Sequence, residues 1–151
     1  MDGKERRCRA YVQTKKITTL FKNYLSAFKA YDLNKVVACY HLPCTLNTPD
    51  KVVLLTSIDA CRQEFADIFA QLKGANISEI IARKASYVLI TENLLLASID
   101  WEFIDEQGEM FADFCAIYHL TLVENELKII NVVSHDLSNS LTLTNVLKLT
   151  T

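Results

Sequence analysis

Apolar and polar side chains alternate through most of the second half of the chain. Between residues 94 and 136 this alternation is broken at residues 107–108 (Gln-Gly) and again at residues 124–125 (Glu-Asn). Alternating runs that are separated by Gly or Asn are typical of antiparallel strands joined by tight hairpins. Residues 77–91 are rich in Ile, Val and Tyr and indicate one more long strand. The sequence therefore predicts four long strands in succession.

The first half of the chain shows the three- and four-residue spacing of helices instead. Apolar residues at this spacing over residues 17–31 predict a helix of about four turns, with Thr14 as its N-cap. Asp32 is expected to cap a second, shorter helix, which Pro43 ends because the residue before a proline avoids the helical conformation. A third apolar stripe predicts a helix over residues 57–74, which begins at a serine cap and ends at a glycine.

The order of these elements predicts the fold class. Two short extended runs flank a Pro-Asp turn at residues 49–50, between the second and third helices. Helices and strands that are segregated along a chain indicate an α+β domain, with helices on one face of an antiparallel sheet. We expect one domain over residues 17–136, with a flexible basic arm before it (residues 1–16) and a tail after it (residues 137–151). The tail could pair as an extra strand, pack on a partner or fray.

Composition supports a single compact domain. The chain has 151 residues, of which 50% are hydrophobic, and it contains only three glycines and two prolines. No apolar run approaches the roughly 20 residues of a membrane-spanning helix, and no secretory signal is visible. The five cysteines are scattered and form no CxxC pair, which fits free thiols in a reducing compartment. We therefore expect a cytoplasmic protein.

Charge is spread unevenly along the chain. The net charge is −2, but the first sixteen residues contain six basic and two acidic side chains. Such a basic arm could contact nucleic acid or an anionic lipid surface. The rest of the sequence shows no basic patch that would continue this footprint, which favours a solvated terminus. We expect neither a nucleic-acid partner nor a membrane partner.

Common cofactor and metal motifs are missing from the sequence. It contains no P-loop, dinucleotide fingerprint or Gly-x-Ser-x-Gly motif, so we expect no cofactor. Cys39, His41 and Cys44 bring three potential zinc ligands close together in the sequence. Their spacing matches no common zinc site, and a fourth ligand is not evident. We expect no bound metal.

A family resemblance rests on four segments. They are residues 28–33 (FKAYDL), 40–43 (YHLP), 52–57 (VVLLTS) and 127–135 (LKIINVVSH). Together they resemble the nuclear transport factor 2-like (NTF2-like) superfamily, which includes SnoaL-like polyketide cyclases, ketosteroid isomerase and scytalone dehydratase. The resemblance covers residues 17–136. Many members open the last strand with Trp-Lys-Ile or Trp-Arg-Ile, whereas this chain has Leu-Lys-Ile there.

The resemblance implies a cystatin-like cone, in which three N-terminal helices pack on a curved, mixed but mostly antiparallel sheet. Members of this superfamily typically have a deep pocket between the helices and the sheet, and dimerise through the outer sheet face. The superfamily includes enzymes and non-enzymatic binders, so the fold alone does not give the function.

The predicted hairpins determine which side chains share a face of the sheet. A two-residue turn at 107–108 would place Trp101 opposite Phe114. A two-residue turn at 124–125 would place Tyr118 opposite Asn131, and Phe114 opposite His135. Because side chains alternate between faces, the cavity face is expected to include these five residues. The other face would carry the carboxylates Asp100, Glu102 and Asp113. A three-residue loop at either turn would reverse this relation.

The predicted cavity face is mostly aromatic and includes a few polar groups, as is usual for small-molecule sites. His135 is the candidate catalytic acid or base, because an unperturbed histidine has a pKa near 6.5. Asn131 could orient a ligand carbonyl, and tyrosine hydroxyls could donate to an oxyanion. A histidine near a strand end is more often structural than catalytic. The predicted ligand-binding residues are Tyr24, Tyr40, Trp101, Phe114, Tyr118 and Asn131.

Two functions follow from this arrangement. In the first, the cone binds a small, largely apolar carbonyl or aromatic molecule, with isomerase, cyclase or dehydratase chemistry as a possibility. The lack of a carboxylate on the predicted cavity face weakens the isomerase interpretation. In the second, the pocket is filled by its own side chains and the protein is a non-catalytic interaction module. In both, the mixed outer face favours a homodimer. An open cavity would separate the two functions.

Overall fold

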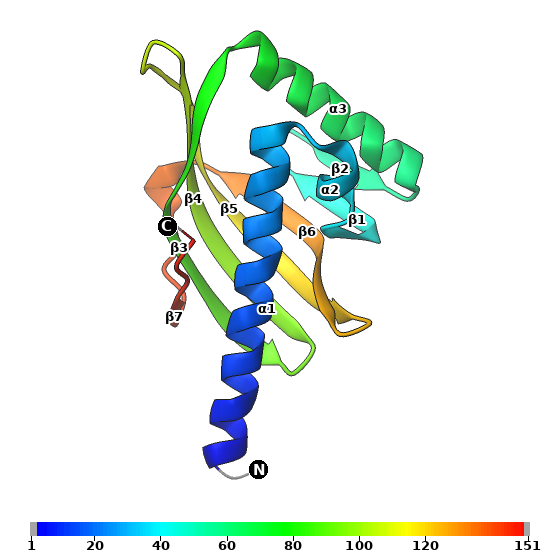
Figure 1. Ribbon diagram of the computed structural model, residues 1–151, viewed down its shortest axis with the longest axis vertical. Coiled ribbons are helices and arrows are strands. Elements are labelled where there is room, and N and C mark those ends of the chain that lie inside the picture. The colour runs from blue at the N-terminus through cyan, green and yellow to red at the C-terminus, as the bar shows by residue number, and fades with distance from the viewer. Residues whose placement is uncertain (1–2, 150–151) are drawn as a thin grey trace.

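The computed structural model describes residues 3–149, without the side chains of residues 6–10. Its α-helices lie on one face of a curved sheet (Figure 1). They are α1 (Gly3–Ala30), α2 (Leu33–Val37) and α3 (Ile58–Gly74). α1 runs along the sheet, and α2 packs against both α1 and α3. None of the helices in the described part of the chain is long and apolar enough to cross a membrane.

The sheet has seven strands in the order β2-β1-β6-β5-β4-β3-β7. The strands are β1 (Tyr40–Asn47), β2 (Val52–Leu55), β3 (Ile77–Thr91), β4 (Leu94–Asp105), β5 (Met110–Val123), β6 (Glu126–His135) and β7 (Asn145–Val146). Among the described strands, β1 and β6 pair in parallel and the other neighbours are antiparallel. The predicted α+β class, with helices on a mixed but mostly antiparallel sheet, is confirmed.

Local capping residues begin two of the helices as predicted. The Asp32 side chain accepts a hydrogen bond from the Lys35 backbone N–H at 3.0 Å, at the start of α2. The Ser57 hydroxyl accepts one from the Ala60 N–H at 3.1 Å, at the start of α3. These side chains satisfy backbone donors that a helix leaves unpaired at its first turn. The left-handed residue after α3 is Asn76, with φ of 55°, and not the predicted glycine.

Two helix boundaries differ from the prediction. α1 begins at Gly3, so Thr14 lies inside the helix and is not its N-cap. The side-chain amide of the buried Gln13 donates to the Glu92 carbonyl at 2.7 Å, and this contact with the β3–β4 turn stabilises the early part of the helix. α2 ends before Tyr40, because the chain there already pairs with β6.

The C-terminal segment (residues 137–149) forms an extra strand, which is one of the three predicted outcomes. It crosses the face of the sheet that points away from the helices, where the Ser98 hydroxyl donates to the Leu141 carbonyl at 3.0 Å. The Leu143 N–H then donates to the Ser86 hydroxyl at 2.8 Å, and β7 pairs with β3. Leu147, in the same segment, is buried.

The hairpin between β4 and β5 reaches the predicted register by a different route. Its loop is longer than predicted, because the Asp105 N–H bonds to the Glu109 carbonyl and Gly108 adopts a φ of 80°. A bulge at Phe111 then offsets the additional loop residue. As a result Trp101 lies opposite Phe114, as predicted.

The hairpin between β5 and β6 begins as predicted and then departs from it. Residues 124 and 125 both have positive φ, as a two-residue hairpin turn requires. Four residue pairs follow in the predicted register, up to Leu120 opposite Ile129. Ile130 then has no partner, and the next pair is His119 with Asn131. Because strand side chains alternate, this single bulged residue reverses the faces of the rest of β6.

Candidate ligand-binding site

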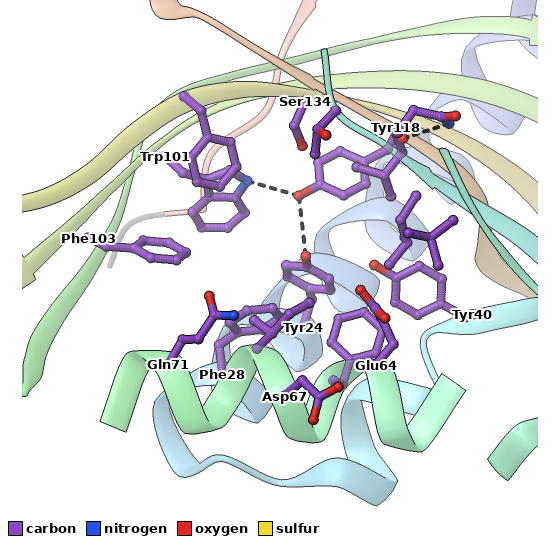
Figure 2. Close-up of a pocket in the computed structure, with 18 of the residues that line it drawn as sticks. Tyr24, Phe28, Tyr40, Glu64, Asp67, Gln71, Trp101, Phe103, Tyr118 and Ser134 are labelled. Atoms are coloured by element: carbon purple, nitrogen blue, oxygen red, sulfur yellow. Dashed lines mark hydrogen bonds between the residues drawn. The ribbon is translucent and has the colours of Figure 1, made fainter. Parts of the chain in front are cut away.

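A cavity of about 440 Å³ lies between α1, α3, the β1–β2 hairpin and the inner face of the sheet. Aromatic rings from both the helices and the sheet line it (Figure 2). They are Tyr24, Phe28, Tyr40, Phe65, Trp101, Phe103, Phe114 and Tyr118. Five of the six predicted ligand-binding residues are in this set. The cavity is open, which favours a ligand-binding role over the predicted alternative of a pocket filled by its own side chains.

The ring packing explains why so many aromatic residues leave a defined space. Tyr24 lies at the centre, with ring centroids of Phe28, Tyr118 and Trp101 at 4.7, 5.8 and 5.9 Å. Its ring is nearly perpendicular to that of Tyr118, at 79°. Edge-to-face contacts of this kind are favourable and fix ring orientation. The cavity wall is therefore rigid at the point where α1 meets β4 and β5.

A directed series of hydrogen bonds runs through the buried polar groups. The indole Nε1–H of Trp101 donates to the Tyr118 hydroxyl at 2.9 Å, which donates to the Tyr24 hydroxyl at 3.5 Å (Figure 2). The Tyr40 hydroxyl lies close enough to Tyr24 for each residue to affect the pKa of the other. An indole can only donate, so it sets the direction of the series. Among the described residues, no close hydrogen bond involves the Tyr40 hydroxyl (Figure 2).

Burial keeps these three phenols protonated. It raises the pKa of Tyr24, Tyr40 and Tyr118 well above the ordinary value near 10, because the phenolate would lose its hydration. Neighbouring tyrosines raise the pKa of each further. At neutral pH the hydroxyls therefore act as hydrogen-bond donors and not as bases.

The rim of the cavity is polar, and its residues are not among the predicted site residues. Glu64, Asp67 and Gln71 extend from α3 toward the cavity, and Lys51 borders it from the β1–β2 turn. The three α3 residues recur at spacings of three and four, so they flank the buried stripe of that helix. This spacing is the feature of the sequence from which the polar rim could have been predicted. Half-buried Glu64 supplies the carboxylate that the strands do not.

Asn131 and His135 lie on the opposite face of the sheet, so the prediction that they face the cavity is wrong. The bulge at Ile130 is the reason, since it places Asn131 beside His119 and His135 beside Cys115. The positions that reach the cavity from the end of β6 are Val132 and Ser134, in the alternate register.

Asn131 and His135, on the outer face, both form hydrogen bonds with structural partners. The Asn131 side-chain oxygen accepts from the Thr45 hydroxyl and from the Asn47 amide, each at 2.6 Å. The Nε2–H of His135 donates to the Asn139 carbonyl at 2.8 Å, next to the short 3₁₀ turn Leu137–Asn139. These contacts join β1 to β6 and hold the start of the C-terminal segment. The catalytic role predicted for His135 in the cavity loses its geometric basis.

The buried phenols predict a loss of stability in alkali. Below pH 10 the folded and unfolded chains carry the same phenolic protons. Above about pH 10 the unfolded chain releases them while the folded chain retains them, so the free energy of unfolding falls as pH rises. Each such phenol contributes a slope of up to about 1.4 kcal/mol per pH unit. Urea unfolding between pH 8.5 and about 11 would measure this slope.

Tyr40→Phe should make that slope shallower by one phenol, while Tyr11→Phe, at an exposed position, should leave it unchanged. Parallel curves for wild type and Tyr40→Phe would contradict the assignment of Tyr40 as a buried, protonated phenol.

Solved structures share this fold at low sequence identity. An NTF2-like protein with a cystatin-like fold from Novosphingobium aromaticivorans has a TM-score of 0.72 and 9% identity, over 90% of this chain and 89% of that chain. A domain of unknown function with a cystatin-like fold from Nostoc punctiforme PCC 73102 has a TM-score of 0.66 and 15% identity, over 84% and 76%. A ketosteroid isomerase-like protein from Erwinia carotovora atroseptica SCRI1043 has a TM-score of 0.62 and 13% identity, over 83% and 96%.

These identities support similarity of fold alone. A comparison with curated proteins finds no match. The sequence profile of one family matches residues 14–137, which is most of the chain and includes every strand that borders the cavity. The chain belongs to the NTF2-like protein family DUF6841.

Proposed function

We propose that the protein binds a small, mostly apolar molecule with an oxygen acceptor, which takes a hydrogen bond from Tyr40. The observation that carries this proposal is the Tyr40 hydroxyl, which lines an open cavity and makes no close hydrogen bond with another described residue (Figure 2). A volume of about 440 Å³ is in the usual range for small-molecule sites.

The chemistry of the wall defines the class of ligand. Aromatic surfaces stabilise an apolar ligand by burial, at roughly 25 cal/mol per Å² of apolar area. A polar atom that enters this cavity loses its water and must be matched by a partner. The Tyr40 hydroxyl can match a carbonyl or ether oxygen, because burial raises its pKa and so keeps it a neutral donor. A ketone on an aromatic ring has both features.

A matched pair of probes tests this binding. 2-Acetylnaphthalene carries a carbonyl, and 2-isopropenylnaphthalene has nearly the same shape with a CH₂ group in place of the oxygen. We expect the ketone to bind wild type about fivefold more tightly, because one buried hydrogen bond contributes about 1 kcal/mol and leaves no donor unmatched. Quenching of the Trp101 fluorescence would give both dissociation constants.

Tyr40→Phe should remove the preference for the ketone and leave the affinity for the hydrocarbon unchanged. Tyr31→Phe is the control, because the Tyr31 ring packs on Phe69 outside the set of cavity-lining residues. The proposal fails if wild type binds neither probe, or if Tyr40→Phe still prefers the ketone.

Proton transfer next to the bound carbonyl is a second candidate function, favoured by the position of Glu64. Its carboxylate is half-buried and lines the same cavity as Tyr40. In this reaction Glu64 takes a proton from the carbon beside the carbonyl. The C–H electron pair forms the C=C bond of an enolate, whose oxygen is stabilised by the Tyr40 hydroxyl. The ketosteroid isomerase-like protein above shares the fold of this chain, which is compatible with such chemistry and does not establish it.

Hydrogen–deuterium exchange measures this step directly. In D₂O, the methyl protons of 2-acetylnaphthalene should exchange faster with wild type than with Glu64→Gln, by about 100-fold if Glu64 is the base. NMR would follow the loss of the methyl signal. Asp67→Asn, on the same rim, should change the rate little. Exchange no faster than in buffer would exclude this reaction for the ketone and leave the binding proposal standing.

Association of two copies through the outer sheet face remains part of the proposal. The C-terminal segment covers the outer side of β3 and β4. On the uncovered side, Val52 and Leu54 of β2 are 70% and 63% exposed, and Val133 of β6 is 38% exposed. Exposed apolar side chains on one continuous face favour a partner of the same kind. A cytoplasmic location is also retained, and the four free, buried thiols of the described chain support it.

Light scattering should show a dimer at micromolar concentration. Val52→Asp with Leu54→Asp should give a monomer that keeps its helix and strand content, because the charges would be buried in the interface. Ile90→Asp, at an exposed position on β3, is the control. A monomeric wild type would end this part of the proposal.

A further inference from the structure

A second groove, of about 350 Å³, shares no lining residue with the ligand cavity. It lies between the first half of α1, the connection from α2 to β1, and the β5–β6 turn. Four lysines border it: Lys15, Lys16, Lys35 and Lys128. Glu126 is the single acidic residue in the lining. The groove is therefore strongly positive in a chain whose net charge is −2.

The lysines are held mainly by neutral groups. Lys16 Nζ donates to the Asn125 side-chain oxygen at 2.7 Å, and Lys35 Nζ donates to the Ser26 hydroxyl at 2.9 Å. Lys128 Nζ donates to a backbone carbonyl and also lies 3.2 Å from the carboxylate of Glu126, which is itself largely exposed. Most of the positive charge is thus not neutralised by the groove itself. Like charges held together in this way favour a bound anion.

An exposed aromatic ring lies next to Lys15, one of the groove lysines, and outside the groove lining itself. Tyr11 is 62% exposed, and Lys15 Nζ lies 4.8 Å from the centre of its ring. From Tyr11, the groove residues Lys15, Thr19 and Asn23 follow at four-residue intervals, so they lie along one side of α1. A flat ring next to ammonium groups is the arrangement that binds a nucleobase and its phosphates together.

The groove also changes the interpretation of the basic N-terminal residues. A nucleic-acid contact was not expected for these residues, because no basic patch that would continue their footprint is visible in the rest of the sequence. Lys35 and Lys128 supply that continuation, and they are too distant in sequence to be grouped without the structure. The first turns of α1, whose sequence includes Lys4 and three arginines, extend beyond the sheet (Figure 1).

We propose that this groove binds single-stranded nucleic acid, with phosphates at the four lysines and an unpaired base stacked on Tyr11. This departs from the expectation of no nucleic-acid partner. A single strand fits better than a duplex, because stacking on Tyr11 requires a base that is free of its partner. It also fits better than a lipid surface, because a flat bilayer cannot enter a concave groove.

Fluorescence anisotropy with a fluorescein-labelled 20-mer of deoxythymidine tests the proposal on the full chain. We expect binding at 50 mM salt that weakens as salt rises, with a slope of about 3 in a plot of log Kd against log salt if four phosphates are contacted. Lys15→Glu with Lys35→Glu should weaken binding at least tenfold. Lys22→Glu with Lys84→Glu makes the same charge change at exposed positions outside the groove and should change binding less than about threefold.

Tyr11 separates stacking from simple charge attraction. Tyr11→Ala should weaken binding about tenfold, whereas Tyr11→Phe keeps an aromatic ring and should bind as wild type. Circular dichroism would confirm that each variant keeps the wild-type fold. The proposal is overturned by any of four results: no binding at 50 mM salt, equal losses for the two lysine pairs, equal affinity for a polyglutamate of the same length, or Lys15-dependent binding to phosphatidylserine vesicles without binding to the oligonucleotide.

Discussion

One unpaired residue in β6 determines which side chains the cavity presents. Ile130 has no partner on β5, so the strand that leaves the bulge shows its other side to the helices. Val132 and Ser134 therefore reach the cavity, while Asn131 and His135 bind neighbouring strands and the C-terminal segment. The polar chemistry of the cavity is consequently concentrated in tyrosines and in α3. A regular β6 would have given a site built around an imidazole.

The tyrosines can serve as donors because of what lies behind them. The Trp101 indole N–H can only donate a hydrogen bond, so the Tyr118 hydroxyl must accept from it. The Tyr118 hydroxyl then donates its own hydrogen bond to Tyr24. The hydroxyls of Tyr118 and Tyr24 each accept a hydrogen bond within this series, whereas the Tyr40 hydroxyl lines the cavity and makes no close hydrogen bond with another described residue. Burial of the tyrosines has two effects on this arrangement. It creates the apolar wall of the cavity, and it keeps the phenols neutral.

Much of the fold could be predicted from the sequence because its determinants are local. The caps Asp32 and Ser57, the bounds of β3 and the turn at residues 124–125 each depend on a few neighbouring residues. The bulge at Ile130 is different. Its only trace in the sequence is a pair of adjacent isoleucines, either of which could face the core. The basic groove was out of reach for another reason, because it joins residues from α1, α2 and β6.

The pairing of β7 with β3 affects how the sheet meets other chains. A strand at the end of a sheet exposes unpaired N–H and C=O groups, which can recruit a strand from another molecule. β3 is fifteen residues long and would be the more hazardous of the two ends, but β7 and the Leu147 N–H occupy part of it. The other end is β2, which has only four residues. By pairing with β3, the C-terminal segment thus blocks strand addition that would lead to uncontrolled polymerisation. This effect does not depend on any ligand.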